Sequence, residues 1–256
     1  MRLILTGDVV STLNGRYGIP LYLDQDRRLD ELERKFLEDL ASSIFSDYDC
    51  LVLSNREVID LYEEHTSRES LPVVSIDDLW KKEGIFYFEI NRKLDSDSGD
   101  VYLAPRAGHE SLENQVKHLV NQLPQGEVML VDRGCIAGGT ILYSASLLGK
   151  EGIRVRKVLL GPHRKEGFDR LKSELGSSVE ISLLSHDWNC EEWVESRDLV
   201  GISGRILKNG GHSPYFAQPS YISARINDPP SFRQQCEYFL REVEMRGGVK
   251  LNRSQF

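Results

Sequence analysis

The segment Val128–Thr140, VMLVDRGCIAGGT, constrains the fold of this 256-residue chain more than any other. It opens with the apolar run 128–131 after a Pro-Gln-Gly turn, a pattern typical of a fully buried strand. Asp132 then ends the strand, and Gly138 and Gly139 allow a tight turn before a second apolar run that reads as a helix. A buried strand that leads through a glycine-rich turn into a helix is typical of α/β sheets, so the segment predicts that architecture.

The same segment also predicts an anion-binding site. Open α/β sheets bind ligands outside the carboxyl ends of their strands, where Asp132 is expected to lie. The following helix presents its N-terminal amides to that edge, and the two glycines let the backbone approach an anion closely. A glycine pair before a helix is also a common structural turn. The segment has a more specific pattern than a glycine pair alone: a strand, an Asp, five residues, Gly-Gly-Thr and a helix. This order favours a phosphate ligand.

This segment resembles the phosphoribosyl pyrophosphate (PRPP) motif of the type I phosphoribosyltransferase family, where a strand with two terminal acids precedes a loop such as Ala-Thr-Gly-Gly-Thr. In that family the acids hold the ribose hydroxyls and the loop cradles the 5′-phosphate. The resemblance implies that Asp132 is catalytic and that the PRPP ribose and phosphate contact Asp132, Arg133, Ala137, Gly138, Gly139 and Thr140. Arg133 replaces the second acid and Ala137 replaces the threonine.

Composition limits the classes of partner and compartment. The formal net charge of −8, with 28% charged residues, argues against broad attraction to nucleic acid. Cys50, Cys135, Cys190 and Cys236 lack any C-x-x-C spacing, which argues against a zinc ribbon or a disulfide framework and favours a reducing cytoplasm. No apolar run approaches the ~18 residues of a membrane span. We therefore expect a cytoplasmic protein without a membrane segment.

Strands and helices are expected to alternate along most of the chain. Strands are predicted at 2–6, 49–53, 72–76, 128–131, 155–160 and 179–184, and helices at 28–45, 110–123, 140–148, 165–175 and 231–245 and after the turn 54–57. This alternation predicts a mostly parallel sheet flanked by helices. We expect an N-terminal strand and helix at 1–46, a phosphoribosyltransferase-like α/β core at 47–186, and an irregular C-terminal hood region with a final helix at 187–256.

Two further segments occupy positions that bind pyrophosphate in the family, so the resemblance implies the same role for them. The turn after the strand 49–53 places Ser54, Asn55 and Arg56 there, although a helix N-cap with a solvated arginine explains them equally well. A hairpin at 85–106 occupies the place of the family's mobile hairpin, which puts Arg92 and Arg106 near pyrophosphate. A solvated hairpin tip is the alternative.

The segment 193–205, WVESRDLVGISGR, resembles the hood of purine and uracil phosphoribosyltransferases. The resemblance implies that Trp193, Val200 and Gly201 approach the base and that Asp198 binds Mg²⁺. The alternatives are a tryptophan in the core, and an ion pair of Asp198 with a neighbouring arginine.

The sequence thus predicts a phosphoribosyltransferase-like protein that binds PRPP or a nucleoside monophosphate with Mg²⁺ and transfers ribose 5-phosphate to a base-like acceptor. The alternative is an inactive module of the same fold that senses a nucleotide or docks to a partner, which Arg133 and Ala137 favour. A sugar-phosphate enzyme of Rossmann type is a third alternative, but the first strand lacks its glycine fingerprint. A homodimer or a protein partner stays open.

Overall fold

Two parallel sheets organise the part of the chain that the computed structural model describes. The described residues are 1–15, 23–77, 80, 82–94, 101–106, 108–123, 126–200, 205–206, 212–213, 225–248 and 250–251. They belong to two compact units, each built around one of these sheets. Unit 1 comprises 1–57, 94–100 and 191–256, and unit 2 comprises 58–93 and 101–190.

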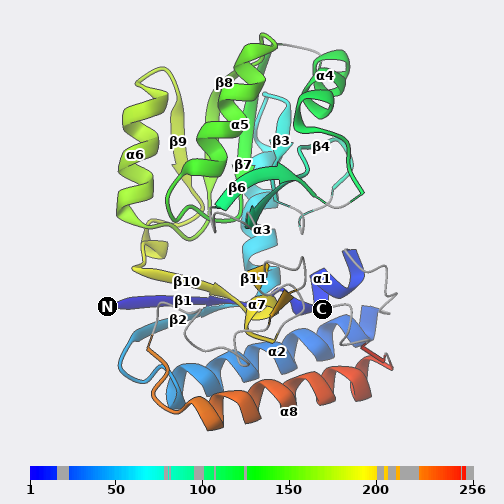
Figure 1. Cartoon of the computed structure of the whole chain (residues 1–256), viewed down its shortest axis with the longest axis vertical. Helices are drawn as coiled ribbons and strands as arrows, with labels where there is room; N and C mark the ends of the chain where they lie inside the picture. The colour runs from blue at the N-terminus through cyan, green and yellow to red at the C-terminus, as the bar shows by residue number, and fades with distance from the viewer. Residues whose placement is uncertain are drawn as a thin grey trace. The chain divides into compact units, whose positions relative to one another are not determined.

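Unit 1 is built on a three-stranded sheet of order β10-β1-β2. The central strand β1 (Arg2–Thr6) pairs in parallel with β2 (Asp49–Leu53) and with β10 (Glu192–Glu195). Its inner residues are fully buried, as expected for an apolar central strand. Segments that are far apart in the sequence therefore form one sheet, as the blue and yellow arrows of Figure 1 show.

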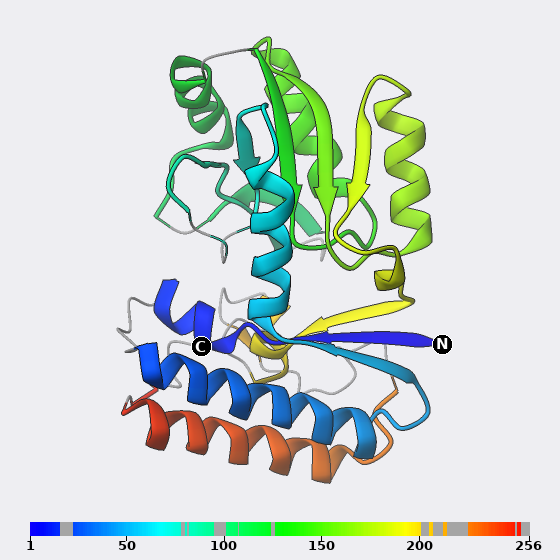
Figure 2. The same cartoon turned by 180° about the vertical axis from the view of Figure 1, so that it is seen from behind.

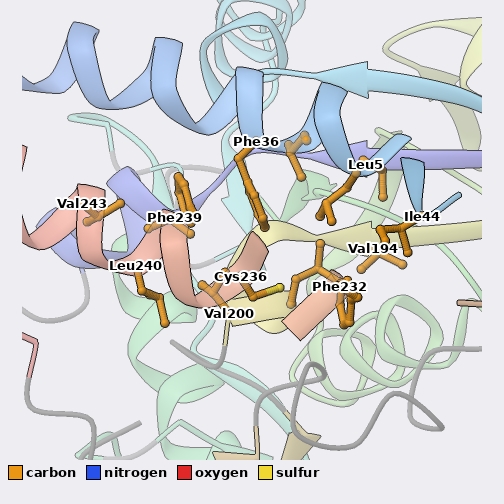
Figure 3. Packing of buried hydrophobic residues seen from close by; sticks show 14 of the residues in the cluster. Leu5, Phe36, Ile44, Val194, Val200, Phe232, Cys236, Phe239, Leu240 and Val243 are labelled. Carbon is orange, nitrogen blue, oxygen red and sulfur yellow. The ribbon is translucent and has the colours of Figure 1, made fainter. Parts of the chain in front are cut away.

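Two long helices, α2 (Leu23–Ser43) and α8 (Pro229–Gly247), pack side by side in unit 1 (Figure 2). Their apolar faces meet in the core of Figure 3, where the rings of Phe36 and Phe239 stack with centroids 4.3 Å apart. The Asp228 side chain caps the start of α8, and Gly248 ends it with a φ of +62°. Two short helices complete this unit as described, α1 (Val9–Gly15) and α7 (Ser196–Val200).

Unit 2 contains a five-stranded sheet of order β4-β3-β7-β8-β9 with every pairing parallel. The strands are β3 (Val73–Ser75), β4 (Phe86–Tyr87), β7 (Glu127–Asp132), β8 (Arg154–Leu160) and β9 (Glu180–Leu183). The helices are α3 (Asn55–Ser67, whose first turn belongs to unit 1), α4 (Leu112–Gln122), α5 (Gly139–Lys150), α6 (Lys165–Leu175) and the short η1 (His186–Trp188). β5 (Ile90–Leu94) and β6 (Val101–Pro105) form a separate two-stranded sheet.

The predicted α/β class, with mostly parallel sheets flanked by helices, is confirmed. Two expectations need correction. The strand at 49–53 was expected in the same sheet as the motif strand, but β2 pairs with β1 along its whole length. The region after 187 was expected to be irregular up to the final helix, yet it contains β10 and α7, because Val194 and Val200 are buried in the core of unit 1.

Within the C-terminal hood region, residues 201–204, 207–211 and 214–224 lie outside the described residues; between them the structure describes the small strand pair β11 (Arg205–Ile206) and β12 (His212–Ser213). Across the described ranges, no helix has both the length and the apolar character needed to cross a bilayer.

Candidate functional site

The turn between β7 and α5 is built as the sequence predicts. Asp132 is the last residue of β7, and α5 begins at Gly139. Gly138 is the N-cap residue and has a φ of +72°, a conformation that favours glycine. It supplies no side-chain cap, so the first amides of α5 are not covered by a capping side chain. Ala137, Gly138, Gly139 and Thr140 thus lie together at the positive end of a helix dipole.

The start of α6 holds this turn in place. A Cβ on Gly167 would overlap the carbonyl oxygen of Ile136, so only glycine allows so close an approach. Arg170 donates from Nη1 to the carbonyl oxygen of Ala137 at 3.2 Å. The backbone of Cys135 is bonded on both sides, to the Pro162 carbonyl and to the Arg164 amide, each at 2.9 Å. The turn is therefore ordered before any ligand arrives.

The two glycines of the turn differ in their surroundings. A Cβ on Gly138 would lie 3.1 Å from the Leu171 side chain, and its positive φ would strain any other residue. A Cβ on Gly139 would meet no atom within 4 Å. A substitution at Gly138 therefore disturbs the protein itself, whereas a side chain at Gly139 would project into open space beside the amides.

Asp132 has an unusual acidity for an aspartate. Its pKa is raised to about 7: burial is the largest cause and the Asp77 carboxylate the next, and Arg92, the Gly134 amide and Arg106 lower it in part. The carbonyl oxygen of Asp132 accepts a hydrogen bond of 2.6 Å from the hydroxyl of Tyr62, on α3. The Tyr62 ring stacks on Trp80, with centroids 5.3 Å apart. The end of β7 is therefore anchored, and its carboxyl group titrates near neutral pH.

The two arginines expected at the pyrophosphate have different positions. Arg92 is exposed, and its Nε lies 3.4 Å from the hydroxyl oxygen of Thr140. Arg106 is mostly buried; its Nη1 lies 2.6 Å from the Glu89 carboxylate and its Nη2 donates to the Ile76 carbonyl at 2.9 Å. Arg92 thus reaches the turn, whereas Arg106 ties β6 to the segment that follows β3.

Arg133, which directly follows Asp132, has a buried side chain, only 4% exposed. Its carbonyl oxygen lies against Gly161, where a Cβ would overlap it. The residue is therefore packed between the ends of β7 and β8.

The segment 54–56 belongs to unit 1. Ser54 and Glu57 form a capping box at the start of α3: the Ser54 amide donates to the Glu57 carboxylate at 2.7 Å, and the Glu57 amide donates to the Ser54 hydroxyl at 3.2 Å. Asn55 donates from its side-chain amide to the hydroxyl of Ser11, and Arg56 is exposed. These contacts match the alternative interpretation of the segment, a helix N-cap with a solvated arginine. The segment also belongs to a different unit from Asp132.

The residues expected to contact the base also belong to unit 1. Trp193, on β10, donates from its indole nitrogen to the hydroxyl of Thr6 at 3.0 Å. Val200 is a core residue of α7, and Asp198 lies half-buried in the same helix. Gly201 lies outside the described residues. The structure therefore does not bring these residues into one unit with the β7–α5 turn.

Unit 1 contains a second polar cluster, at the carboxyl ends of β1 and β10, which we call the Glu33 network. Glu33 is buried, and its Oε1 accepts the amides of Asp8 at 2.9 Å and Val9 at 2.7 Å and contacts the Ser196 hydroxyl. Asp8 accepts the Ser196 hydroxyl and the Arg197 amide, each at 2.8 Å. Burial raises the pKa of Glu33.

Sequence reasoning missed Asp77 and Tyr62 in unit 2 and the whole Glu33 network in unit 1. Asp77 directly follows the predicted strand 72–76, so its place at a strand end was a signal that could have found it. Within the described ranges, no group of three or more His, Cys, Asp or Glu side chains is arranged to hold a metal ion.

No protein-family model matches the chain, and no curated protein matches it by sequence. Among solved structures, a crystal structure of adenine phosphoribosyltransferase superposes with a TM-score of 0.32 and 13% identity. The superposition covers 51% of this chain and 79% of that chain. A likeness this loose assigns neither a family nor a function to the protein.

Proposed function

We propose that unit 2 binds PRPP or a nucleoside 5′-monophosphate at the β7–α5 turn and transfers ribose 5-phosphate to a nitrogen of a base-like acceptor. The observation that carries the proposal is the start of α5. Its first amides have no side-chain cap, and the Cα of Gly139 faces open space, which together suit the three oxygens of a phosphate. The helix dipole adds a favourable charge interaction.

The groups around the turn suit the remainder of such a ligand. Asp132 lies at the strand end next to the turn, and its ionised carboxylate accepts hydrogen bonds from hydroxyl groups. Arg92, close to Thr140, supplies an exposed positive charge for a second phosphate group. An anion site, an acceptor for hydroxyl groups and an exposed cation suit a sugar phosphate that carries a diphosphate leaving group.

The proposed reaction needs no nucleophilic side chain. The bond between C1 of the ribose and the pyrophosphate oxygen breaks, the acceptor nitrogen bonds to C1, and the acceptor loses its proton. Because positive charge develops on the ribose, catalysis comes from holding both reactants in line and from stabilising the departing pyrophosphate. In this proposal Mg²⁺ is bound through the substrate phosphates. Among the described residues no group of three or more His, Cys, Asp or Glu side chains is arranged to hold it, and Asp198 lies in unit 1.

The second candidate function is a module that binds the same ligand without turnover. The buried side chain of Arg133 and the engagement of Arg106 by Glu89 favour it, because neither cation is then presented to a leaving group. Pyrophosphate release from PRPP with Mg²⁺ and a panel of nucleobases separates the two candidates. Binding of PRPP without release by the wild type, at any pH between 6 and 9, would support the module.

The binding site itself is tested by Gly139→Asp. An acid at the first turn of α5 should stabilise the helix by about 0.3–1 kcal/mol, because its charge complements the dipole. The same charge occupies the proposed phosphate seat, so the affinity for ribose 5-phosphate should fall at least about tenfold, or about 1.4 kcal/mol. Calorimetry measures the affinity, and thermal unfolding measures the stability.

Gly149→Asp is the matched control. Gly149 is an exposed glycine of the same helix, and a Cβ there also meets no atom within 4 Å. Near the C-terminal end an acid should lower stability by a similar small amount and leave the affinity unchanged. Equal affinity of Gly139→Asp and wild type for ribose 5-phosphate would show that the anion binds elsewhere.

A further inference from the structure

We propose that Asp77 is a second ribose-binding residue, which acts with Asp132 to make the site prefer a sugar with two neighbouring hydroxyls over a deoxy sugar. The inference deepens the proposed function and rests on it. It concerns the selectivity of the site for the sugar, which the phosphate seat on α5 does not determine.

The topology of unit 2 places Asp77 beside the end of β7. Strands β3 and β7 are parallel neighbours, with Ser75 opposite Val131, and the Ile76 amide donates to the Val131 carbonyl at 3.0 Å. Both strands therefore end at the same level of the sheet, and Asp77 and Asp132 follow from adjacent strand ends. This is the edge at which parallel sheets bind their ligands.

Asp77 is held in a defined conformation at this edge. It is only 6% exposed, and the hydroxyl of Ser75 bridges its backbone amide and carbonyl, each at 3.2 Å. Along β7 itself, the residue after Asp132 is the buried Arg133, so no second carboxylate follows Asp132 on its own strand. The neighbouring strand provides one instead.

The two carboxylates interact through their charges. The pairing of β3 with β7 places the two groups at adjacent strand ends, and after burial the charge of Asp77 is the largest cause that raises the pKa of Asp132. Ionised carboxylates only accept hydrogen bonds, so a close pair favours a partner that donates at least two. A vicinal diol provides two donors at neighbouring positions. The pair is therefore suited to the 2′ and 3′ hydroxyls of a ribose whose phosphate lies at α5.

The test compares ribose 5-phosphate with 2-deoxyribose 5-phosphate on the full chain by calorimetry at pH 8.5, where Asp132 of the wild type is mostly ionised. The wild type should bind the ribose compound at least about tenfold more tightly, because the deoxy compound forms one charge-assisted hydrogen bond fewer with the carboxylate pair. Asp77→Asn should reduce this preference to about threefold or less and leave the affinity for inorganic phosphate unchanged. The pKa of Asp132, followed by NMR, should fall in the same variant.

Asp169→Asn is the matched control. Asp169 is an exposed aspartate of unit 2 that pairs with Lys165, one turn away on α6, and its removal should change neither the preference nor the pKa of Asp132. If Asp77→Asn does not fold, Asp77→Ser takes its place with the same expectation.

The possible outcomes separate the two proposals. A folded variant at position 77 that keeps the full preference would overturn the role of Asp77 and leave the proposed function intact. A wild type that binds both sugar phosphates equally would also overturn this inference, without touching the phosphate seat. A wild type that binds neither sugar phosphate would overturn the proposed function, and this inference with it.

Discussion

Removal of the Glu33 carboxyl group should destabilise unit 1 substantially. Its Oε1 accepts the amides of Asp8 and Val9; in Glu33→Ala the Asp8 amide keeps its second acceptor, the Ser196 hydroxyl at 3.0 Å, whereas the Val9 amide loses its acceptor. An unsatisfied buried donor costs about 1–3 kcal/mol, so we expect a loss of about 1–3 kcal/mol from the Val9 amide, before the weaker bonding of the Asp8 amide or any cavity is counted. That is a large share of the roughly 5–15 kcal/mol that stabilises a typical domain. Glu33→Gln keeps the acceptor oxygen and should cost less.

The same carboxyl group should make the stability of unit 1 depend on pH. Burial is the first cause that raises the pKa of Glu33 above its ordinary value of 4.5; the hydrogen bonds from Ser196, Val9 and Asp8 oppose it, and Asp30 raises the pKa slightly. Because the folded pKa lies above the unfolded one, its contribution is complete below pH 4.5 and is lost as the pH rises through the folded value. The carboxylate of Asp8 and the guanidinium of Arg197, which pair at 2.9 Å, also belong to this network. Glu33→Gln should remove this part of the pH dependence.

Hydrogen exchange gives a local readout that does not require two-state unfolding of the whole chain. The amides of Asp8 and Val9 should exchange much faster in Glu33→Ala, while amides of β7 in unit 2 should not change. Glu38→Ala is the matched control, since Glu38 is an exposed acid of the same helix that pairs with Arg34 across one turn. Unchanged exchange at both amides in Glu33→Ala, or a Glu33→Gln protein that keeps the full pH dependence, would refute the reasoning.

Two further predictions concern unit 2. Gly167→Ala should destabilise the protein by about 1–3 kcal/mol and weaken sugar-phosphate binding, because the new methyl group pushes α6 away from the carbonyl of Ile136. Chemical denaturation measures the stability and calorimetry measures the affinity. If neither changes, the turn does not need this contact. Asp132→Asn should gain stability relative to wild type as the pH rises from the ordinary pKa of 3.8 to the folded value of about 7, because over this range ionisation of Asp132 favours the unfolded chain. Identical pH profiles of the two proteins would contradict a raised pKa of Asp132.

The β7–α5 segment and the helix at 165–175 were predictable because their signals are local. A continuous apolar run followed by Asp and a glycine pair admits few structures, and α6 has its apolar residues at helical spacing up to the predicted end, Leu175. The same local signals placed Ala137, Gly138, Gly139 and Thr140 correctly at one turn.

Strand partners were less predictable, because pairing between distant segments leaves little trace in a single sequence. The strand 49–53 was found, but nothing in DCLVL indicates that it pairs with β1 rather than with β3. In β10 two acidic residues flank the apolar pair Trp193 and Val194, a pattern too short to indicate a partner, and the strand pairs with residues 189 positions away, Glu192 with Leu3. The pairing of Arg106 with Glu89 likewise depends on the fold of the segment between them.

The position of β1 between β2 and β10 has a consequence for the way in which the protein is made. A ribosome releases β1 and β2 early, but β10 leaves it only after all of unit 2 has been synthesised. During that interval β1 has a neighbour on one side and an open hydrogen-bonding edge on the other, which is the kind of edge that recruits strands from other chains. Translation speed through 58–190 and chaperone supply should therefore decide how much of the nascent protein reaches its native sheet.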